Sequence, residues 1–351
     1  MTPFNYSRRT FVKTLSSGLA GAAGGFALSA CSQPTSTKNN DRDNDEYPIG
    51  NDDEGMPNQQ RPSYYNLLPR RPLGNTDMDV SMLSFGGGSQ FMANEHGDWE
   101  PLLERALELG INYFDTSIDY EGSEARFSEI LTPIRDQIYI ASKFNGMKHE
   151  RRNADVMKQE LETTLKRLKT DYLDVYMVHA VDENDTLSDI SKIYDEMKRL
   201  QDQRVIKQVG FSSMDSAAKS AELLKTFEFD VCMLAINPTK YGDYETVAVP
   251  EAIKKNTGVL AMKVMRNVVG KDGTTAEELL SWALDRDGVA GAVIAHLGRP
   301  TLEQNAEIVM KYKPSVVPHG WSYLETRLHR YAGPHALCWA HPNYKDEFLV
   351  A

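Results

Sequence analysis

The feature that most constrains the fold is an alternation of short apolar, β-branched runs with amphipathic helical patterns, from Val80 to Tyr312. Apolar positions spaced by three and four residues mark the longer segments as helices with one buried face. The strand-like runs cover residues 80–85, 111–116, 138–143, 172–179, 206–211, 230–236, 258–264 and 288–295. The clearest helical patterns cover residues 99–109, 154–168, 190–200, 275–284 and 301–312.

Eight strand–helix units of roughly 30 residues each predict a closed parallel (β/α)8 barrel, the TIM barrel architecture. An open doubly wound sheet is the alternative, but it usually has fewer units and a glycine-rich first turn that opens a helix. Here the glycines at 86–88 are followed by SQFMANEHGD, which is typical of a long loop. We therefore expect a barrel over residues 63–313.

Four polar side chains follow the apolar runs of neighbouring units. Asp115, Lys143 and His179 lie at the ends of three successive runs, and Tyr120 lies in the loop five residues after Asp115. Taken singly, each has a simple structural explanation, such as a solvated lysine or a buried histidine. Active sites of such barrels, however, lie where the strands end, and all four residues fall there. Their joint position favours a functional set.

The chemistry of this set suits the protonation of an oxygen while a hydride reaches the attached carbon. A phenol ordinarily has a pKa near ~10, and a neighbouring ammonium lowers it because it stabilises the phenolate. A carboxylate beside the lysine keeps the lysine charged and oriented. An imidazole can orient a substrate carbonyl or share the proton. The sequence therefore predicts acid–base chemistry at the barrel rim.

From about Arg70 to Lys313 the chain resembles the aldo-keto reductases. RRPLGNTDMDVSMLSFGGG resembles the first hairpin and strand of that family, and FDTSIDYEGSE resembles its Asp…Tyr signature. The resemblance implies NAD(P)H-dependent reduction of an aldehyde or ketone, or oxidation of the alcohol. The resemblance implies that Tyr120 is the general acid and that Lys143 and Asp115 adjust its pKa. It also implies that His179 orients the substrate carbonyl.

The resemblance also implies a cofactor site at the barrel mouth. GFSS (210–213) resembles the segment that holds the nicotinamide carboxamide, and GRPTLEQN (298–305) resembles the loop that holds the adenosine end. The implied cofactor contacts are Gly87, Gly88, Asp115, Ser212, Ser213, Met233, Met262, Lys263, Arg299, Gln304 and Asn305. Two methionines, Met233 and Met262, stand where many relatives carry a glutamine and an aromatic residue. Arg299 can bind a phosphate in place of the arginine that NADP-preferring relatives carry at Thr301, so we expect NADP(H) rather than NAD(H).

The first 31 residues predict an export signal. SRRTFVK (7–13) resembles the twin-arginine signal, and the Gly/Ala-rich run at 14–30 is too short and too polar for a membrane span. The segment ends in LSAC, which resembles the lipobox of bacterial lipoproteins, with Cys31 as the lipidated residue. We expect export by the twin-arginine machinery, a lipid anchor at Cys31 and a periplasmic or cell-envelope location. Residues 32–62 have few large apolar side chains, which is typical of a disordered linker.

The composition argues against two kinds of ligand, nucleic acids and metal ions. The net charge is -11, and outside the N-terminus there is no basic cluster larger than Arg151–Arg152, which argues against a nucleic-acid partner. Three cysteines are too few for a disulfide framework, and none pairs with another at a metal-ligand spacing, so we expect no metal site.

The tail, residues 314–351, is the least familiar part of the chain. It contains one possible metal-binding group, formed by His335, Cys338 and His341, which we consider a minor alternative. Its aromatic residues predict that the tail packs over the barrel mouth and shapes the substrate pocket. These are Trp321, Tyr323 and Trp339.

Two non-catalytic functions remain as alternatives. One is a nucleotide-binding or redox-sensing module, and the other is an envelope lipoprotein with a structural or carbohydrate-binding role. If the protein is an exported enzyme, we expect its cofactor to be bound before export and retained, because nicotinamide cofactors are scarce outside the cytoplasm. A second substrate would then have to regenerate the cofactor in place.

Overall fold

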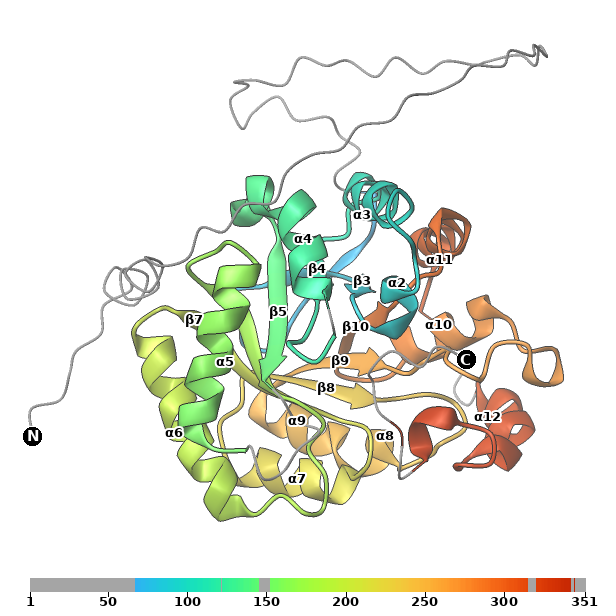
Figure 1. The fold of residues 1–351 in the computed structure, drawn as a ribbon. Helices are drawn as coiled ribbons and strands as arrows, with labels where there is room; N and C mark the ends of the chain where they lie inside the picture. The colour runs from blue at the N-terminus through green and yellow to red at the C-terminus, as the bar shows by residue number, and fades with distance from the viewer. Residues whose placement is uncertain (1–66, 121, 145–151, 315–319, 342–343, 345–351) are drawn as a thin grey trace, which may run out of the picture.

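The computed structural model describes residues 67–120, 122–144, 152–314, 320–341 and 344. The expected signal segment (1–31) and linker (32–62) lie outside these ranges. The centre of the molecule is a closed barrel of parallel strands in the order β3-β4-β5-β6-β7-β8-β9-β10, with β10 paired back to β3. Figure 1 shows these strands surrounded by the longer helices. The predicted (β/α)8 barrel is thus confirmed.

All eight expected runs contribute a barrel strand, with ends that differ by a few residues. The strands are β3 (Leu83–Gly86), β4 (Tyr113–Asp115), β5 (Tyr139–Phe144), β6 (Leu173–Val178), β7 (Ile206–Ser213), β8 (Val231–Ala235), β9 (Gly258–Met262) and β10 (Val289–Ile294).

The first expected strand, 80–85, is divided in the structure. Its beginning belongs to β2 (Asp79–Ser81), which pairs antiparallel with β1 (Arg70–Pro72), and only its end belongs to the barrel strand β3. Met82 lies between the two strands. Its backbone N–H donates to the Pro69 carbonyl at 2.9 Å, and its carbonyl accepts the Ala292 N–H at 2.9 Å. A continuous apolar run could not reveal this change of strand partner.

The hairpin β1–β2 closes the amino end of the barrel. Its turn packs against the start of β9, where a Cβ on Gly74 would lie 2.3 Å from the Gly258 nitrogen, and Gly74 has a φ of +57°. Both the contact and the left-handed backbone require glycine there. Apolar side chains of the hairpin then fill the barrel interior together with side chains of the strands. The buried members are Leu73, Met78, Val80, Tyr113, Ala141, Val175, Met177, Val231, Met233, Leu260, Ala290 and Val293.

The helices form the outer layer. The α-helices are α2 (Ser89–Met92), α3 (Trp99–Glu108), α4 (Ser123–Leu131), α5 (Ala154–Arg167), α6 (Leu187–Asp202), α7 (Ala217–Thr226), α8 (Tyr244–Val247), α9 (Val249–Lys255), α10 (Ala276–Leu284), α11 (Arg299–Lys311) and α12 (Ser322–Leu328). The 3₁₀ turns are η2 (Thr132–Gln137), η4 (Lys271–Gly273), η5 (His329–Tyr331) and η6 (Cys338–Ala340). Among the described residues, no helix has the length and apolar character needed to cross a membrane.

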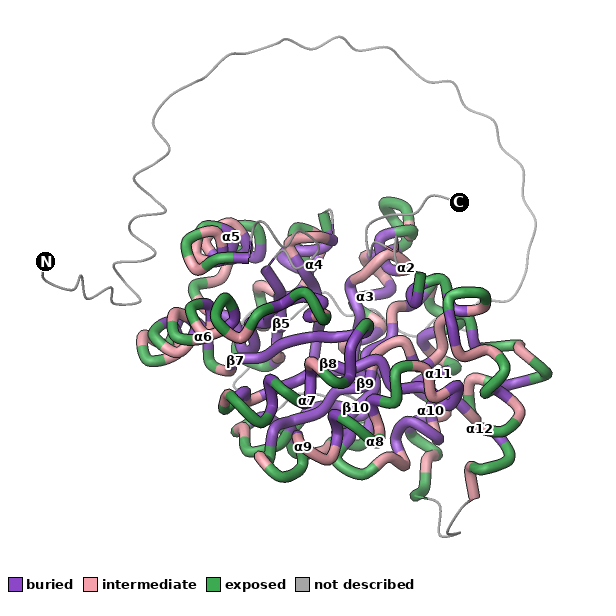
Figure 2. Tube along the Cα trace, turned by 90° about the horizontal axis from the view of Figure 1, so that it is seen from below, coloured by how far each residue is buried: buried purple, intermediate pink, exposed green. Residues whose placement is uncertain are grey.

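Local sequence explains where several helices begin. Asn153, Thr186 and Ser216 accept a backbone N–H at the starts of α5, α6 and α7, and Thr275 forms a reciprocal capping box with Glu278 at the start of α10. The inner faces of these helices are buried against the strands, whereas the outer faces are exposed (Figure 2). The five helical patterns expected from sequence correspond to α3, α5, α6, α10 and α11.

The aromatic residues of the tail lie in two places. Trp321 donates to the Asp285 carboxylate at 2.6 Å and Tyr323 donates to Glu278 at 3.3 Å, so both lie along α10 on the outside of the barrel. Trp339 is fully buried and donates to a backbone carbonyl of the loop after β9 at 3.3 Å. Of the three, only Trp339 reaches the barrel mouth, because acidic groups at α10 hold the polar edges of the other two.

Candidate active site

Parallel pairing brings the strand-end residues of the candidate set to one rim of the barrel. Asp115 is the last residue of β4 and pairs with Ala141 of β5, and Lys143 of β5 pairs with Met177 of β6. His179 directly follows β6. All of them therefore lie at the carboxyl ends of neighbouring strands, where βα loops form the active sites of such barrels.

Lys143 is the centre of this arrangement. Its side chain is only 1% exposed, and its Nζ donates to an Asp115 carboxylate oxygen at 2.6 Å and to the Thr116 carbonyl at 2.8 Å. The same Nζ lies 5.0 Å from the centre of the Tyr120 ring. A buried ammonium is stable only beside a counter-charge, which Asp115 supplies. The positive charge next to Tyr120 stabilises its phenolate form.

His179 completes the group, which we call the tetrad: Asp115, Tyr120, Lys143 and His179. The rings of Tyr120 and His179 meet edge to face, with centroids 5.6 Å apart and an interplanar angle of 83°. His179 Nδ1 lies 2.8 Å from an Asp119 carboxylate oxygen. The structure thus brings together all four side chains that the sequence singles out for catalysis.

Two residues that sequence reasoning missed hold His179 in place. Asp119 bonds its ring, and Arg152 donates to the backbone carbonyls of His179 and Ala180, each at 2.8 Å. Arg152 also forms a buried ion pair with Asp185. Asp119 could have been found from the sequence, because it directly precedes Tyr120 within the same motif. Arg152 had no such signal, because its contacts depend on how the chain returns to the rim.

A small cavity of about 90 Å³ opens beside the tetrad. Asp115 and Tyr120 line it, together with Gly88, Met233 and Met262 from the set of expected cofactor contacts. A Cβ on Gly88 would stand 3.6 Å from the Tyr120 ring, so glycine keeps this side of the cavity open. The volume is below the roughly 300 Å³ at which ligand pockets begin, so a dinucleotide would extend beyond it over the surface.

Two cations, Lys263 and Arg266, border the cavity, and we call them the cation pair. Tyr344 of the tail covers them: its ring centre is 4.9 Å from Lys263 Nζ and 5.5 Å from the Arg266 guanidinium. Lys263 also donates to the Tyr344 hydroxyl at 3.1 Å, and Arg266 donates to the Ser89 hydroxyl at 2.7 Å. Two cations at the mouth fit the phosphates of a nicotinamide dinucleotide. Sequence reasoning missed Arg266, three residues after Lys263.

Other expected cofactor contacts do not line this cavity. The Ser212 hydroxyl accepts the Ala180 amide at 3.0 Å, and the Ser213 hydroxyl donates to the Val181 carbonyl at 2.7 Å. Both hydroxyls thus support the loop that follows His179. Gly87 is explained by packing, because a Cβ there would lie 2.5 Å from the Ser123 hydroxyl oxygen.

The three expected contacts in α11 also lie apart from the cavity. Arg299 and Gln304 are exposed and Asn305 is buried. The Arg299 guanidinium is 3.5 Å from the Glu303 carboxylate. The structure therefore groups Gly88, Met233, Met262 and Lys263 with the tetrad, whereas the three α11 residues do not line this cavity.

Two buried ionisable residues adjoin the site. Burial raises the pKa of the Glu124 carboxyl, although hydrogen bonds from Thr164 at 2.7 Å and Ser142 at 2.9 Å oppose the rise. His296 follows β10 and packs on Phe85, with ring centroids 5.7 Å apart. Burial lowers the pKa of His296 from its ordinary 6.5 to about 3, so this histidine is neutral in the folded protein.

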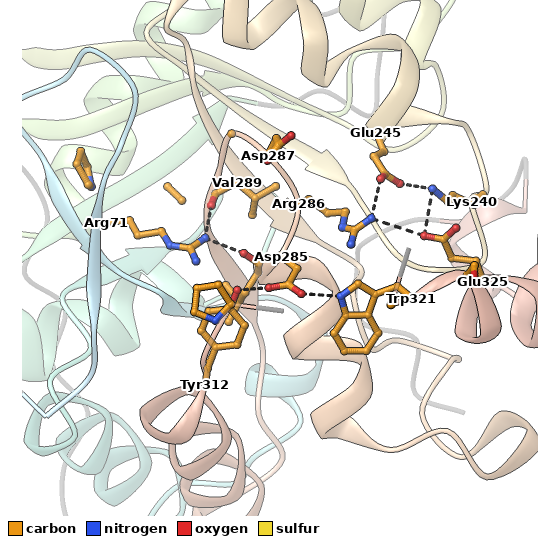
Figure 3. A pocket seen from close by; sticks show the side chains of 17 residues that line it. Arg71, Lys240, Glu245, Asp285, Arg286, Asp287, Val289, Tyr312, Trp321 and Glu325 are labelled. Atoms are coloured by element: carbon orange, nitrogen blue, oxygen red, sulfur yellow. Dashed lines mark hydrogen bonds and ion pairs between the residues drawn. The ribbon is translucent and has the colours of Figure 1, made fainter. Parts of the chain in front are cut away.

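A larger cavity of about 880 Å³ lies at the opposite end of the barrel, between β1, the turn before β10 and the tail. Figure 3 shows that four of its charged groups are paired with one another, namely Lys240 and Arg286 with the Glu245 and Glu325 carboxylates. Asp285 bonds both Tyr312 and Trp321, and Arg286 lies 2.9 Å from Glu245. These pairs tie the tail to α10, which gives the cavity a structural explanation.

Metal-binding groups are not found in the described ranges, where no three His, Cys, Asp or Glu residues could hold an ion together. Within the tail, a ring nitrogen of His335 lies 2.9 Å from the Arg330 carbonyl oxygen.

The chain is similar to curated relatives. It is 26% identical over 289 residues to methylglyoxal reductase YeaE of Escherichia coli, an alignment that covers 70% of this chain and 96% of that protein. It is 29% identical over 156 residues to the uncharacterized oxidoreductase YqkF of Bacillus subtilis, and 28% identical over 153 residues to L-galactose dehydrogenase of Arabidopsis thaliana. The last two alignments cover 42% and 41% of this chain but only 49% and 48% of the relatives, so the chain matches about half their length.

Solved structures and a family model complete the comparison. An aldo-keto reductase structure from Pseudomonas aeruginosa matches with a TM-score of 0.61 and 26% identity, covering 72% of this chain and 98% of that one. Aldo-keto reductase AKR11C1 of Bacillus halodurans, in its holo form, matches with a TM-score of 0.61 and 20% identity, and the alignment covers 76% of this chain and 96% of that one. At this identity the match supports the fold alone. The model of the aldo/keto reductase family matches residues 82–267, more than half of the chain. That match spans β3 to β9 and includes the whole tetrad, and the chain therefore belongs to the aldo/keto reductase family.

Proposed function

We propose that the protein is an NAD(P)H-dependent oxidoreductase that reduces an aldehyde or ketone, or oxidises the alcohol, with Tyr120 as the general acid. The observation that carries this proposal is the position of the Lys143 ammonium, 2.6 Å from the Asp115 carboxylate and 5.0 Å from the centre of the Tyr120 ring. The names of the relatives support a small carbonyl or alcohol substrate, since they include a methylglyoxal reductase and a sugar dehydrogenase.

Each member of the tetrad has a distinct part in this proposal. Tyr120 donates its phenolic proton to the substrate oxygen, and Lys143 stabilises the phenolate that remains. Asp115 keeps the lysine charged and aimed. His179, packed against Tyr120, orients the substrate oxygen.

The residues around the small cavity fit a nicotinamide dinucleotide. Met233 and Met262 give an apolar wall for a ring, Gly88 keeps the approach to Tyr120 open, and the cation pair would bind the phosphates of the cofactor. The bound cofactor would supply hydride chemistry at this wall. We favour NADP(H) over NAD(H), because the exposed guanidinium of Arg299 offers a further cation for an additional phosphate.

The test of catalysis is Tyr120→Phe, which removes one oxygen and keeps the ring. We expect kcat to fall by roughly 10²- to 10⁴-fold while NADPH binding, measured by fluorescence, stays unchanged. Tyr323→Phe is the matched control, because that hydroxyl is exposed and lies along α10. If Tyr120→Phe turns over as fast as the wild type, Tyr120 is not the general acid. NADPH binding without any turnover in the wild type would favour a nucleotide-binding or redox-sensing module.

We also propose that the protein is exported by the twin-arginine route and anchored through a lipid at Cys31, with residues 32–62 as linker. Replacing Arg8 and Arg9 by lysine should leave the protein in the cytoplasm. Cys31→Ser should leave it unlipidated, which mass spectrometry of the mature N-terminus would detect. Nicotinamide in protein purified from the envelope would support cofactor retention, and cofactor-free envelope protein that binds NADPH weakly would refute it.

A further inference from the structure

Arg152 joins the start of α5 to the loop that follows β6. It directly precedes Asn153, the residue that caps α5. Its Nη2 donates to the backbone carbonyls of His179 and Ala180, each at 2.8 Å. One guanidinium nitrogen thus bonds two successive carbonyls at the point where the chain leaves the barrel strand.

The backbone of Ala180 makes this double bond possible. In an extended strand successive carbonyls point in opposite directions, so one donor cannot reach two of them. Ala180 stands between the two carbonyls and has a φ of +49°, in the left-handed region, where both turn to the same side. A residue with a Cβ adopts this conformation only at a cost in free energy. The two hydrogen bonds from Arg152 offset that cost.

Asp185 supplies the counter-charge and closes the loop. Its carboxylate pairs with Arg152 and also accepts the Asp182 backbone N–H at 2.9 Å. The side chains of the pair are only 2% and 3% exposed. On the other side of the loop, the Ser212 hydroxyl accepts the Ala180 N–H at 3.0 Å. A buried guanidinium is stable beside such a carboxylate, so the pair can hold the loop firmly.

A second buried arginine makes the same kind of contacts at the other end of the barrel. Arg135 pairs with Asp174 at 2.7 Å and donates to the carbonyls of Ile138 and Tyr172, each at 3.1 Å. These carbonyls directly precede β5 and β6, away from the tetrad. The Ile138 backbone is extended, with a φ of −133°. The arginine at the rim therefore differs from this one in that it holds a left-handed turn.

We propose that Arg152 is a positioning residue: it holds Ala180 in the left-handed conformation and thereby fixes the backbone from which the His179 ring reaches Tyr120. That ring meets Tyr120 edge to face, with centroids 5.6 Å apart. Rotation of the peptide between His179 and Ala180 would turn the end of β6 and move the ring out of this contact. The inference rests on the proposed function, in which His179 orients the substrate oxygen.

Three variants of the full-length chain test the inference. Arg152→Met/Asp185→Asn removes the guanidinium without leaving a buried charge, and the asparagine can still accept the loop N–H. Arg135→Met/Asp174→Asn is the matched control. The third variant adds Ala180→Gly to the first pair, because glycine adopts the left-handed region without a Cβ penalty. Circular dichroism and urea unfolding show that each variant folds.

The first measurement reads the ring position without any substrate. Tyr120 shifts the NMR signals of the His179 ring through its ring current, since the two rings are in contact. With ¹³C-labelled histidine, and with His179→Gln to assign the signals, we expect the Arg135 control to match the wild type. The Arg152 variant should lose the shift, and added Ala180→Gly should restore it. Wild-type His179 signals in the Arg152 variant would overturn the inference.

The second measurement is turnover with benzaldehyde and NADPH as probes. We expect kcat of the Arg152 variant to fall about 10- to 100-fold. NADPH binding should stay unchanged, because Arg152 does not line the small cavity. Added Ala180→Gly should recover about tenfold, the factor by which alanine disfavours the left-handed region. The Arg135 control should lose stability but keep its kcat. Equal kcat losses in both arginine variants, or no recovery with glycine, would indicate a structural role and contradict the inference.

The two proposals can fail separately. Suppose that Tyr120→Phe abolishes turnover, but the Arg152 variant keeps the wild-type His179 signals and kcat. The proposed function would then stand and the inference would be overturned. If instead the signals move and return as expected in a protein without oxidoreductase activity, the proposed function is refuted, and Arg152 only orders the loop.

Discussion

His296 should make the folded protein sensitive to mild acid. The side chain is 1% exposed, and within the described residues neither ring nitrogen has a hydrogen-bond partner. Burial is the cause of its lowered pKa, from 6.5 to about 3. Below pH 6.5 the unfolded chain therefore binds a proton that the folded chain excludes, and stability falls as the pH falls.

The size of the effect follows from the same values. Each pH unit between 6.5 and about 3 costs roughly 1.4 kcal/mol, so the free energy of unfolding should drop by about 2.5 kcal/mol between pH 7 and pH 4.5. Domains are typically stable by only ~5–15 kcal/mol, so this loss is easily measured. His296→Leu keeps an apolar side chain against Phe85 and removes the titration.

Urea unfolding at pH 7 and pH 4.5, followed by circular dichroism, is the assay. The wild type should lose about 2.5 kcal/mol more than His296→Leu between the two pH values, since other titrating groups cancel in the comparison. His329→Gln, which replaces an exposed histidine, should behave like the wild type. Parallel losses in the wild type and His296→Leu would refute the assignment of a neutral, buried histidine.

Three further substitutions test the site and its support. Lys143→Met should destabilise the fold by about 3–5 kcal/mol in urea unfolding, because it leaves the buried Asp115 carboxylate without its counter-ion, and it should abolish turnover. Gly87→Ala should lower stability by at least ~1 kcal/mol, since its Cβ would stand 2.5 Å from the Ser123 hydroxyl, and an unchanged urea midpoint would contradict this packing. Tyr344→Ala removes the ring that covers the cation pair, so calorimetric binding of NADPH should tighten by about two- to fivefold, and weaker binding would show that the ring supports the cofactor instead.

The sequence by itself determined the architecture and the rim on which the candidate site lies. The strands of a parallel sheet are buried on both faces, so they are visible in the sequence as near-continuous apolar runs. Eight such runs that alternate with helices can form few closed sheets other than a (β/α)8 barrel. Parallel pairing also places all strand ends of one kind on one rim. For that reason Asp115, Lys143 and His179 could be grouped from sequence alone, with Tyr120 in the adjoining loop.

Only the tertiary structure decided what surrounds that rim. The change of strand partner at Met82 depends on hydrogen bonds to distant segments, and a run of apolar residues carries no sign of it. Side-chain directions in loops are likewise set by long-range contacts. Thus Asp119 turns to His179, whereas the Ser212 and Ser213 hydroxyls turn into the protein to hold the loop after β6. Periodicity reports which face of an element is buried, and it does not report which partner a loop residue meets.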